Sequence, residues 1–232
     1  MARISLCVSD SSMSKRNLRL SPYSDSLPPF FALIIPFVYD IYIMVGASIL
    51  PACFYNGELY FLFGKENSLA DTPGWSDFGG GVDKGETIYD TALREGGEEL
   101  TGFLGDGKQI GSLIKRSGGV YKMQYETYHI HLFNLEYNTD LVKHYNDNHR
   151  FLWQRMNKKF LTDTKLFEKI EIKWFSLREM KKCREQFRNF YRNVVDLILK
   201  EEPNIRKFLS KKSSTRRQTR SIRKTQKKTS WF

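Results

Sequence analysis

The chain has 232 residues, of which 41% are hydrophobic and 14% are aromatic. That length suits one folded domain of roughly 150 residues with extensions, and the composition excludes a chain that is disordered throughout. The formal net charge is +11, from 37 Lys and Arg against 26 Asp and Glu. Residues 203–232 hold 11 of these cations and no acid, which leaves 26 charges of each sign before them. The body of the chain is therefore neutral and has no bulk electrostatic reason to bind polyanions.

The cysteines argue against a secreted protein. There are three of them, Cys7, Cys53 and Cys183, and none belongs to a CxxC pair. An odd number of widely spaced cysteines favours neither a disulfide framework nor a structural zinc site. We expect a reducing, intracellular compartment, with the cytoplasm first and the nucleus as an alternative.

Residues 1–43 are predicted to be an extension outside the domain, with its role left open. Residues 1–25 are rich in Ser, and the apolar stretch that follows is interrupted by Asp40 and several prolines. Its longest uncharged piece, residues 41–57, has 17 residues, at the short limit of what a membrane helix needs. We therefore expect neither a membrane anchor nor a signal peptide.

The domain is predicted to begin at residue 44 with a β-hairpin. Residues 47–54 and 59–63 are rich in β-branched and aromatic side chains, and Asn56-Gly57 between them is a hairpin turn signal. A turn is expected at residues 79–81, which are three glycines, and a helix over residues 86–100.

The second half of the domain is predicted to contain strands and a closing helix. Residues 121–137 indicate one or two strands, residues 146–150 a loop, and residues 169–175 another strand. Apolar residues three and four apart predict one amphipathic helix over residues 177–200. The fold class is therefore α/β, with the domain over residues 44–202 and a disordered basic tail over residues 203–232.

Four glutamates and one arginine lie within 14 residues: Glu86, Arg94, Glu95, Glu98 and Glu99. On a helix the last three glutamates stand at i, i+3 and i+4, so we expect them to share one face. Carboxylates this close repel one another unless divalent cations lie between them, and hard oxygen ligands favour Mg²⁺ or Mn²⁺. Arg94 precedes Glu98 by four residues and is placed to orient a carboxylate.

The pattern Gly80-x5-Glu86-x7-Arg94-Glu95-x2-Glu98-Glu99 resembles the Nudix box, the signature of hydrolases that cut a diphosphate joined to another moiety. The resemblance covers residues 44–200 and implies an α/β/α sandwich with a mixed β-sheet, in which the box forms a loop, a helix and a loop. It implies Glu95, Glu98, Glu99 and the carbonyl of Gly79 as metal ligands, and Arg94, Glu95 and Glu98 as catalytic residues. Gly96 departs from the family pattern, because an aliphatic residue is usual there; Thr101 also departs, because it replaces a usual glycine. Gly96 indicates either a locally soft helix or a helix pressed tightly against the sheet.

Cleavage of a diphosphate requires charge neutralisation and a deprotonated water, and metal ions supply both. A carboxylate must take the proton. Glu98 is one candidate for this base, and Glu126, Glu168 and Glu171 are candidates outside the box.

The basic tail favours an RNA-linked substrate, such as an mRNA cap, over a free nucleotide. A short, aromatic-rich chain with such a tail also resembles box-bearing decapping enzymes of large DNA viruses. The alternatives are hydrolysis of small nucleotides, nucleotide sugars or inositol pyrophosphates, and a non-catalytic protein that binds nucleotides or RNA with the same fold. The residues that contact the substrate and the oligomeric state are left open.

Overall fold

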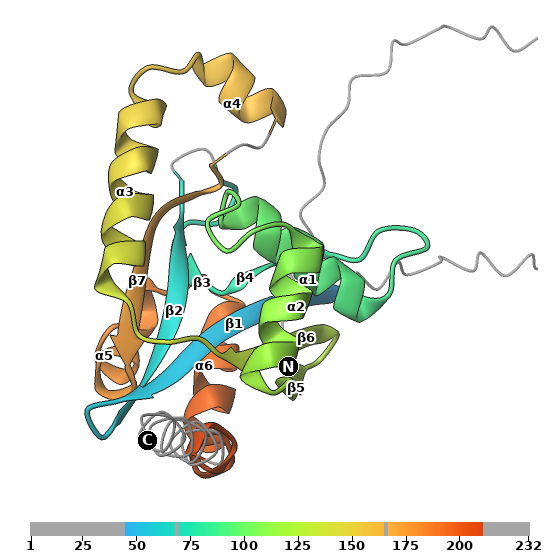
Figure 1. Ribbon diagram of the computed structural model, residues 1–232. Helices are drawn as coiled ribbons and strands as arrows, with labels where there is room; N and C mark the ends of the chain where they lie inside the picture. The colour runs from blue at the N-terminus through green and yellow to red at the C-terminus, as the bar shows by residue number, and fades with distance from the viewer. Residues whose placement is uncertain (1–44, 68–69, 165–166, 211–232) are drawn as a thin grey trace, which may run out of the picture. The chain divides into compact units, whose positions relative to one another are not determined.

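The computed structural model describes residues 45–67, 70–164 and 167–210 (Figure 1). The extension predicted for residues 1–43 lies outside this part of the chain, as do residues 211–232 of the predicted tail. Within the described ranges, no helix is both long and apolar enough to cross a membrane.

The predicted hairpin is confirmed as strands β1 (Gly46–Tyr55) and β2 (Glu58–Glu66). Asn56 and Gly57 between them have φ angles of 49° and 83°. Two successive positive φ angles are what a two-residue hairpin turn requires, and Asn-Gly adopts them readily.

The hairpin forms the centre of a seven-stranded mixed sheet. The strand order is β3 (Trp75–Ser76), β2, β1, β6 (Tyr128–Asn134) and β5 (Val120–Tyr125), with β4 (Phe78–Gly81) paired to β1 and β7 (Lys169–Ser176) paired to β2. Strands β1 and β6 are parallel, whereas the other pairs are antiparallel. The strands predicted within residues 121–137 and 169–175 are confirmed.

The turn predicted at the three glycines is wrong, because Gly79, Gly80 and Gly81 belong to strand β4. This strand pairs with the start of β1, where Gly79 lies opposite Ser48. A Cβ on Gly79 would overlap the Ser48 side chain and the carbonyl of Ala47. Glycine is therefore needed here for a close approach between two strands, not for a change of direction.

Helices cover both faces of the sheet (Figure 1). Helices α1 (Ile88–Glu99), α2 (Gly107–Ser117) and α3 (Thr139–Trp153) contribute to the core on one face. The other face is covered by α5 (Leu177–Lys182), α6 (Tyr191–Lys200) and a helix over residues 202–210. Helix α4 (Lys158–Thr164) leads from α3 toward β7. The predicted α/β/α sandwich is confirmed.

The single helix predicted over residues 177–200 is wrong. The chain instead forms α5, a 3₁₀ turn at Arg184–Gln186 and α6. Between the last two, Phe187 makes a β-bridge to Trp75, and the Arg188 amide donates to the Trp75 carbonyl at 3.1 Å. This pairing with the sheet edge outweighs helix continuation, while Phe187 remains buried with the rest of the apolar stripe.

Two other predicted irregular segments are helical. Residues 146–150 lie within α3, where the Asn146 side chain bonds both the amide (2.8 Å) and the carbonyl (3.1 Å) of Ile172 on β7. The first residues of the predicted tail also fold, because Ile205 and Leu209 are 0% and 2% exposed in the helix over residues 202–210. The folded domain therefore extends at least eight residues beyond the predicted boundary at residue 202.

Candidate metal and catalytic site

Strand β4 and helix α1 carry the box, and α1 packs directly on the sheet. The Thr87 side chain caps α1 by accepting a hydrogen bond from the Asp90 amide at 3.1 Å. Gly96 faces Ile49 of β1 so closely that an added Cβ would overlap the isoleucine side chain. Of the two interpretations of Gly96, the structure therefore supports the tightly packed helix.

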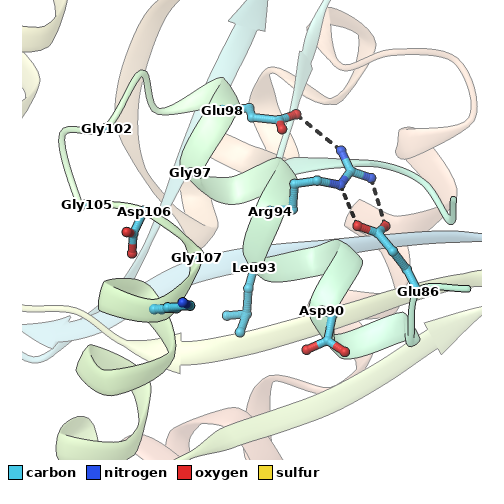
Figure 2. A pocket seen from close by; sticks show the side chains of 11 residues that line it. Glu86, Asp90, Leu93, Arg94, Gly97, Glu98, Gly102, Gly105, Asp106 and Gly107 are labelled. Carbon is cyan, nitrogen blue, oxygen red and sulfur yellow. Dashed lines mark hydrogen bonds and ion pairs between the residues drawn. The ribbon is translucent and has the colours of Figure 1, made fainter.

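Arg94 forms ion pairs with four carboxylates, and we call Asp83, Glu86, Arg94, Glu95 and Glu98 the Arg94 cluster. Figure 2 shows Arg94 with Glu86 and Glu98. The guanidinium donates to both oxygens of Glu86, from Nε at 2.8 Å and from Nη2 at 3.0 Å. Its Nη1 donates to Glu95 at 2.8 Å and to Glu98 at 3.2 Å. The predicted contact between Arg94 and Glu98 is confirmed. One nitrogen thus brings the carboxylates of Glu95 and Glu98 together.

The Arg94 cluster has more negative than positive charge, since four carboxylates face one guanidinium. Hydrogen bonds from Arg94 and Thr91 lower the pKa of Glu86 to about 2. Burial raises the pKa of Glu95, although Arg94 opposes that shift. A Cβ on Gly80 would lie 2.5 Å from the Glu95 carboxyl carbon, so glycine gives this carboxylate room against the strand. With all four acids ionised, the cluster has a formal charge of −3.

The three glutamates do not all point to one side, contrary to the prediction. Glu95 and Glu99 both lie against strand β4, whereas Glu98 faces solvent. The side chain of Glu98 is 61% exposed and that of Glu99 only 5% exposed. Glu99 Oε2 accepts a hydrogen bond from the Gly79 amide at 2.8 Å, and Oε1 lies 3.2 Å from Lys169 Nζ. Neighbouring residues on a helix point about 100° apart, and this rotation turns Glu99 toward the sheet.

Lys169 lies at the centre of a second group, the Lys169 cluster, formed by Glu66, Ser76, Glu99, Lys169 and Arg188. The Lys169 ammonium donates to Glu66 Oε1 at 2.5 Å and to Ser76 Oγ at 2.8 Å. Arg188 also donates to Glu66 Oε1, at 2.8 Å. Two carboxylates thus face two cations, and the cluster is formally neutral.

In the buried pair of Lys169 and Glu99, the lysine keeps its positive charge. Burial lowers the pKa of Lys169, but the carboxylates of Glu99 and Glu66 outweigh that effect and raise it. Burial raises the pKa of Glu99 to about 8, although Lys169 acts to lower it. Sequence reasoning missed this cluster because Glu66 and Lys169 are 103 residues apart; the only local signal is a lysine at the start of a largely apolar strand.

Glu168 is the candidate base outside the box that lies near the site. Its charge raises the pKa of both Glu95 and Glu99. Glu126 lies in the turn between β5 and β6, and Glu171 pairs across the sheet with Lys65 on β2. The structure thus brings one of the three outside candidates to the box.

The carboxylates of the described residues do not already converge on one cation position, since no three His, Cys, Asp or Glu side chains form a metal-binding group there. Arg94 and Lys169 stand between them. The donor set of the Arg94 cluster nevertheless fits Mg²⁺ or Mn²⁺, because it offers hard oxygen ligands with an uncompensated negative charge. This cluster borders a pocket between α1 and the start of α2, with Glu98 and Arg94 on one wall and Asp106 on the other (Figure 2).

Comparison with known families identifies the class of protein. Residues 51–197 match the family model described as the NUDIX domain, which covers more than half of the chain. The chain therefore belongs to the Nudix family.

Particular relatives are more distant. "Uncharacterized protein L534" of Acanthamoeba polyphaga mimivirus is 46% identical over 59 residues, which span 24% of this chain and 19% of the relative. An Ap4A hydrolase from C. elegans is 17% identical with a TM-score of 0.42, covering 69% of this chain and 97% of that one. A bifunctional NMN adenylyltransferase/ADP ribose pyrophosphatase from Francisella tularensis is 16% identical with a TM-score of 0.43. This similarity covers 68% of this chain and 41% of that one. The chain thus spans about a fifth of the viral relative.

Proposed function

We propose that this chain is a Mg²⁺- or Mn²⁺-dependent hydrolase that cleaves the pyrophosphate bond of a nucleoside diphosphate joined to another group. The observation that carries the proposal is the Arg94 cluster, in which Glu95 and Glu98 share one guanidinium nitrogen beside a pocket. Its formal charge of −3 leaves negative charge for a divalent cation to balance, whereas the Lys169 cluster is already neutral.

Each residue of the site has a role in this proposal. Glu98 would hold the metal from the open side, and Glu95, Glu99 and the Gly79 carbonyl would hold it from the inner side. Arg94 fixes the first two carboxylates by charge-assisted hydrogen bonds, as outer-shell groups do at metal sites. When bound, the metal neutralises the diphosphate and lowers the pKa of a water.

A carboxylate then accepts the proton of the attacking water, with Glu98 and Glu168 as the two candidates. Glu168 is favoured among the acids outside the box by its electrostatic effect on Glu95 and Glu99. If Glu168 is the base, Glu168→Gln lowers kcat about 100-fold and removes the acidic limb of the pH–rate profile, with KM unchanged. The control is Glu171→Gln on β7, and an unchanged acidic limb in Glu168→Gln assigns the base to Glu98.

An RNA-linked diphosphate is the substrate that the described surface supports best. Residues 150–160, which we call the basic arm, contain four cations and no acid. Phe151 and Phe160 on this arm are 55% and 50% exposed, and the Arg155 guanidinium lies 3.9 Å from the Phe151 ring centroid. Cations interleaved with exposed aromatic rings suit a single strand of nucleic acid, whose bases stack while its phosphates pair with the cations.

The helix that leads into the basic arm contacts the box. On α3, which leads into the arm, the Tyr145 hydroxyl donates to the Glu99 carbonyl at 2.9 Å. An RNA body attached to a diphosphate at the Arg94 cluster therefore has the arm within its reach. Small nucleotides, nucleotide sugars and inositol pyrophosphates are the alternative substrates, and binding without cleavage is the alternative function.

One assay separates these alternatives. The full chain is incubated with Mg²⁺ and, in parallel, with capped RNA, nucleoside triphosphates, ADP-ribose, Ap4A and diphosphoinositol phosphates, and the products are identified. We expect turnover of capped RNA to exceed that of the small substrates. Turnover of a small substrate alone assigns that substrate instead, and no turnover of any of them contradicts the enzyme.

The basic arm has its own test. Replacing Arg155, Lys158 and Lys159 with alanine should raise KM for capped RNA at least about tenfold, since each lost phosphate contact weakens binding. KM for a small diphosphate should not change. The control replaces one arginine and two lysines elsewhere on the surface, Arg116, Lys181 and Lys182. Equal effects of the two triple variants would contradict the arm as an RNA-binding surface.

We also propose an intracellular location, in the cytoplasm or the nucleus. Cys53 and Cys183 are both free, and burial raises the pKa of the Cys53 thiol to about 12. A buried thiol of this kind is stable in a reducing compartment. Localisation of the tagged chain tests this directly.

A further inference from the structure

A positive charge of the chain itself lies inside the proposed metal site. The Lys169 side chain is completely buried, and its ammonium contacts Glu66 at 2.5 Å, Ser76 at 2.8 Å and Glu99 at 3.2 Å. An ammonium has three donor hydrogens, so three acceptors satisfy it completely. A buried lysine without such partners would cost several kcal/mol. This position is therefore built to hold a cation.

The fold also makes room for the stem of this lysine. Gly64 on β2 lies beside it, and a Cβ there would come within 2.8 Å of both Cγ and Cδ of Lys169. Any other residue at position 64 would push the lysine out of its place.

Glu99 stands between this cation and the Arg94 cluster. Both of its oxygens are engaged within the chain, one by Lys169 and the other by the Gly79 amide. Its neighbour Glu98, by contrast, is turned toward solvent. A divalent ion on Glu99 would have to take an oxygen from Lys169 and would lie within a few ångströms of the ammonium, where like charges repel.

We propose that Lys169 competes with the divalent cation for Glu99 and so divides the site into two steps of unequal affinity. This inference rests on the proposed function. The first Mg²⁺ or Mn²⁺ binds through Glu95 and Glu98, where the charge is uncompensated. A second ion binds through Glu99 only when Lys169 releases that carboxylate, and its affinity is correspondingly weak. Lys169 is thus a positioning residue that sets how many metal ions the site holds at a given concentration of Mg²⁺ or Mn²⁺.

The test is a Mn²⁺ titration of the full chain, in which binding is measured by calorimetry and by the electron paramagnetic resonance signal of free Mn²⁺. The wild-type chain should show one tight and one weak site. Lys169→Met should tighten the weak site at least tenfold and leave the tight site within about threefold. Because its Glu99 gains a partner only from the metal, this variant should also gain more thermal stability from Mn²⁺ than the wild type gains.

Two control variants separate direct competition from a general change of charge. Lys173→Met removes a half-exposed lysine from the same strand and should leave both affinities unchanged. Arg188→Gln removes a cation of the Lys169 cluster that contacts Glu66 instead of Glu99, and it should tighten the weak site less than threefold. If Arg188→Gln and Lys169→Met tighten it equally, direct competition at Glu99 is wrong.

Glu99→Gln tests the role of Glu99 in the weak site even if Lys169→Met does not fold. Glu99→Gln should remove the weak site and leave the tight site within about twofold of the wild type. Loss of the tight site in Glu99→Gln would mean that the first ion also binds through Glu99, and it would overturn the role of Lys169. Metal binding by the wild-type chain would still support the proposed function. A wild-type chain that binds no Mn²⁺ would instead overturn the proposed function, and this inference with it.

Discussion

Glu98 and Glu99 are adjacent on one helix, yet they belong to two different electrostatic environments. Glu98 faces solvent in the Arg94 cluster, where four carboxylates share one guanidinium. Glu99 is buried in the Lys169 cluster, where two carboxylates face two cations. The first cluster needs an external cation to balance its charge, and the second does not. Identical side chains in one motif therefore have different roles, set by the charges that the rest of the fold brings to them.

Of the changes that test this comparison, removal of the buried Lys169 ammonium should have the largest effect on the free energy of unfolding. Lys169→Met leaves Glu66 and Glu99 buried with one charge uncompensated, and breaking a buried ion pair in this way costs about 3–5 kcal/mol. We expect that loss in the free energy of unfolding, measured by urea denaturation without metal. The control is Lys173→Met, which is half-exposed and should change the free energy by less than about 0.5 kcal/mol. Equal stability of the two variants would mean that the Lys169 cluster is not balanced as described.

A second prediction concerns a buried carboxylate whose hydrogen-bond partners are hydroxyls instead of a cation. Asp77 accepts hydrogen bonds from Ser48 at 2.5 Å and Tyr128 at 2.6 Å, and burial raises its pKa to about 6. The folded state therefore holds this proton more tightly than the unfolded state does. Stability from this group is present at about pH 4 and is lost as the pH rises through about 6, with a total of about 3 kcal/mol.

Asp77→Asn removes that titration. The difference in unfolding free energy between the wild type and this variant should therefore shift by about 3 kcal/mol between about pH 4 and about pH 7, against the wild type at the higher pH. Urea denaturation at several pH values measures it. Parallel stability curves for the two proteins would contradict the assignment of the raised pKa to Asp77.

A smaller effect is expected where α1 rests on the sheet. Gly96→Ala would push the helix away from Ile49 and cost about 1–3 kcal/mol, as overpacking of a core does. Because α1 carries Glu99, the displacement should also weaken the contact between Glu99 and Lys169. Combining it with Ile49→Val should recover part of the loss, whereas Gly97→Ala on the same helix has no comparable overlap. No recovery in the double variant would argue against contact with Ile49 as the cause.

Local patterns in the sequence predicted the elements that depend on nearby residues. The Asn56-Gly57 hairpin, the helix of the box and the contact between Arg94 and Glu98 all join positions close in the chain, and all are confirmed. The resemblance to the Nudix box added the sandwich architecture.

The features that the sequence did not predict depend on distant residues. The helix over residues 177–200 is interrupted because Phe187 and Arg188 pair with Trp75, more than a hundred residues away. The inward turn of Glu99 depends on Lys169, and neither spacing nor periodicity relates the two. In the predicted tail, the high density of cations hid Ile205 and Leu209, whose spacing of four residues is that of a buried helix face.

The most direct test of the account is a comparison of Glu98→Gln and Glu185→Gln in one experiment that measures Mn²⁺ binding and hydrolysis of capped RNA. Both glutamates are largely exposed, at 61% and 73%, so neither change should alter the free energy of unfolding by more than about 0.5 kcal/mol. We predict that Glu98→Gln loses the tight Mn²⁺ site and at least about 100-fold in kcat, while Glu185→Gln behaves as the wild type. A Glu98→Gln variant that keeps both the tight site and wild-type turnover would contradict the placement of the metal at the Arg94 cluster.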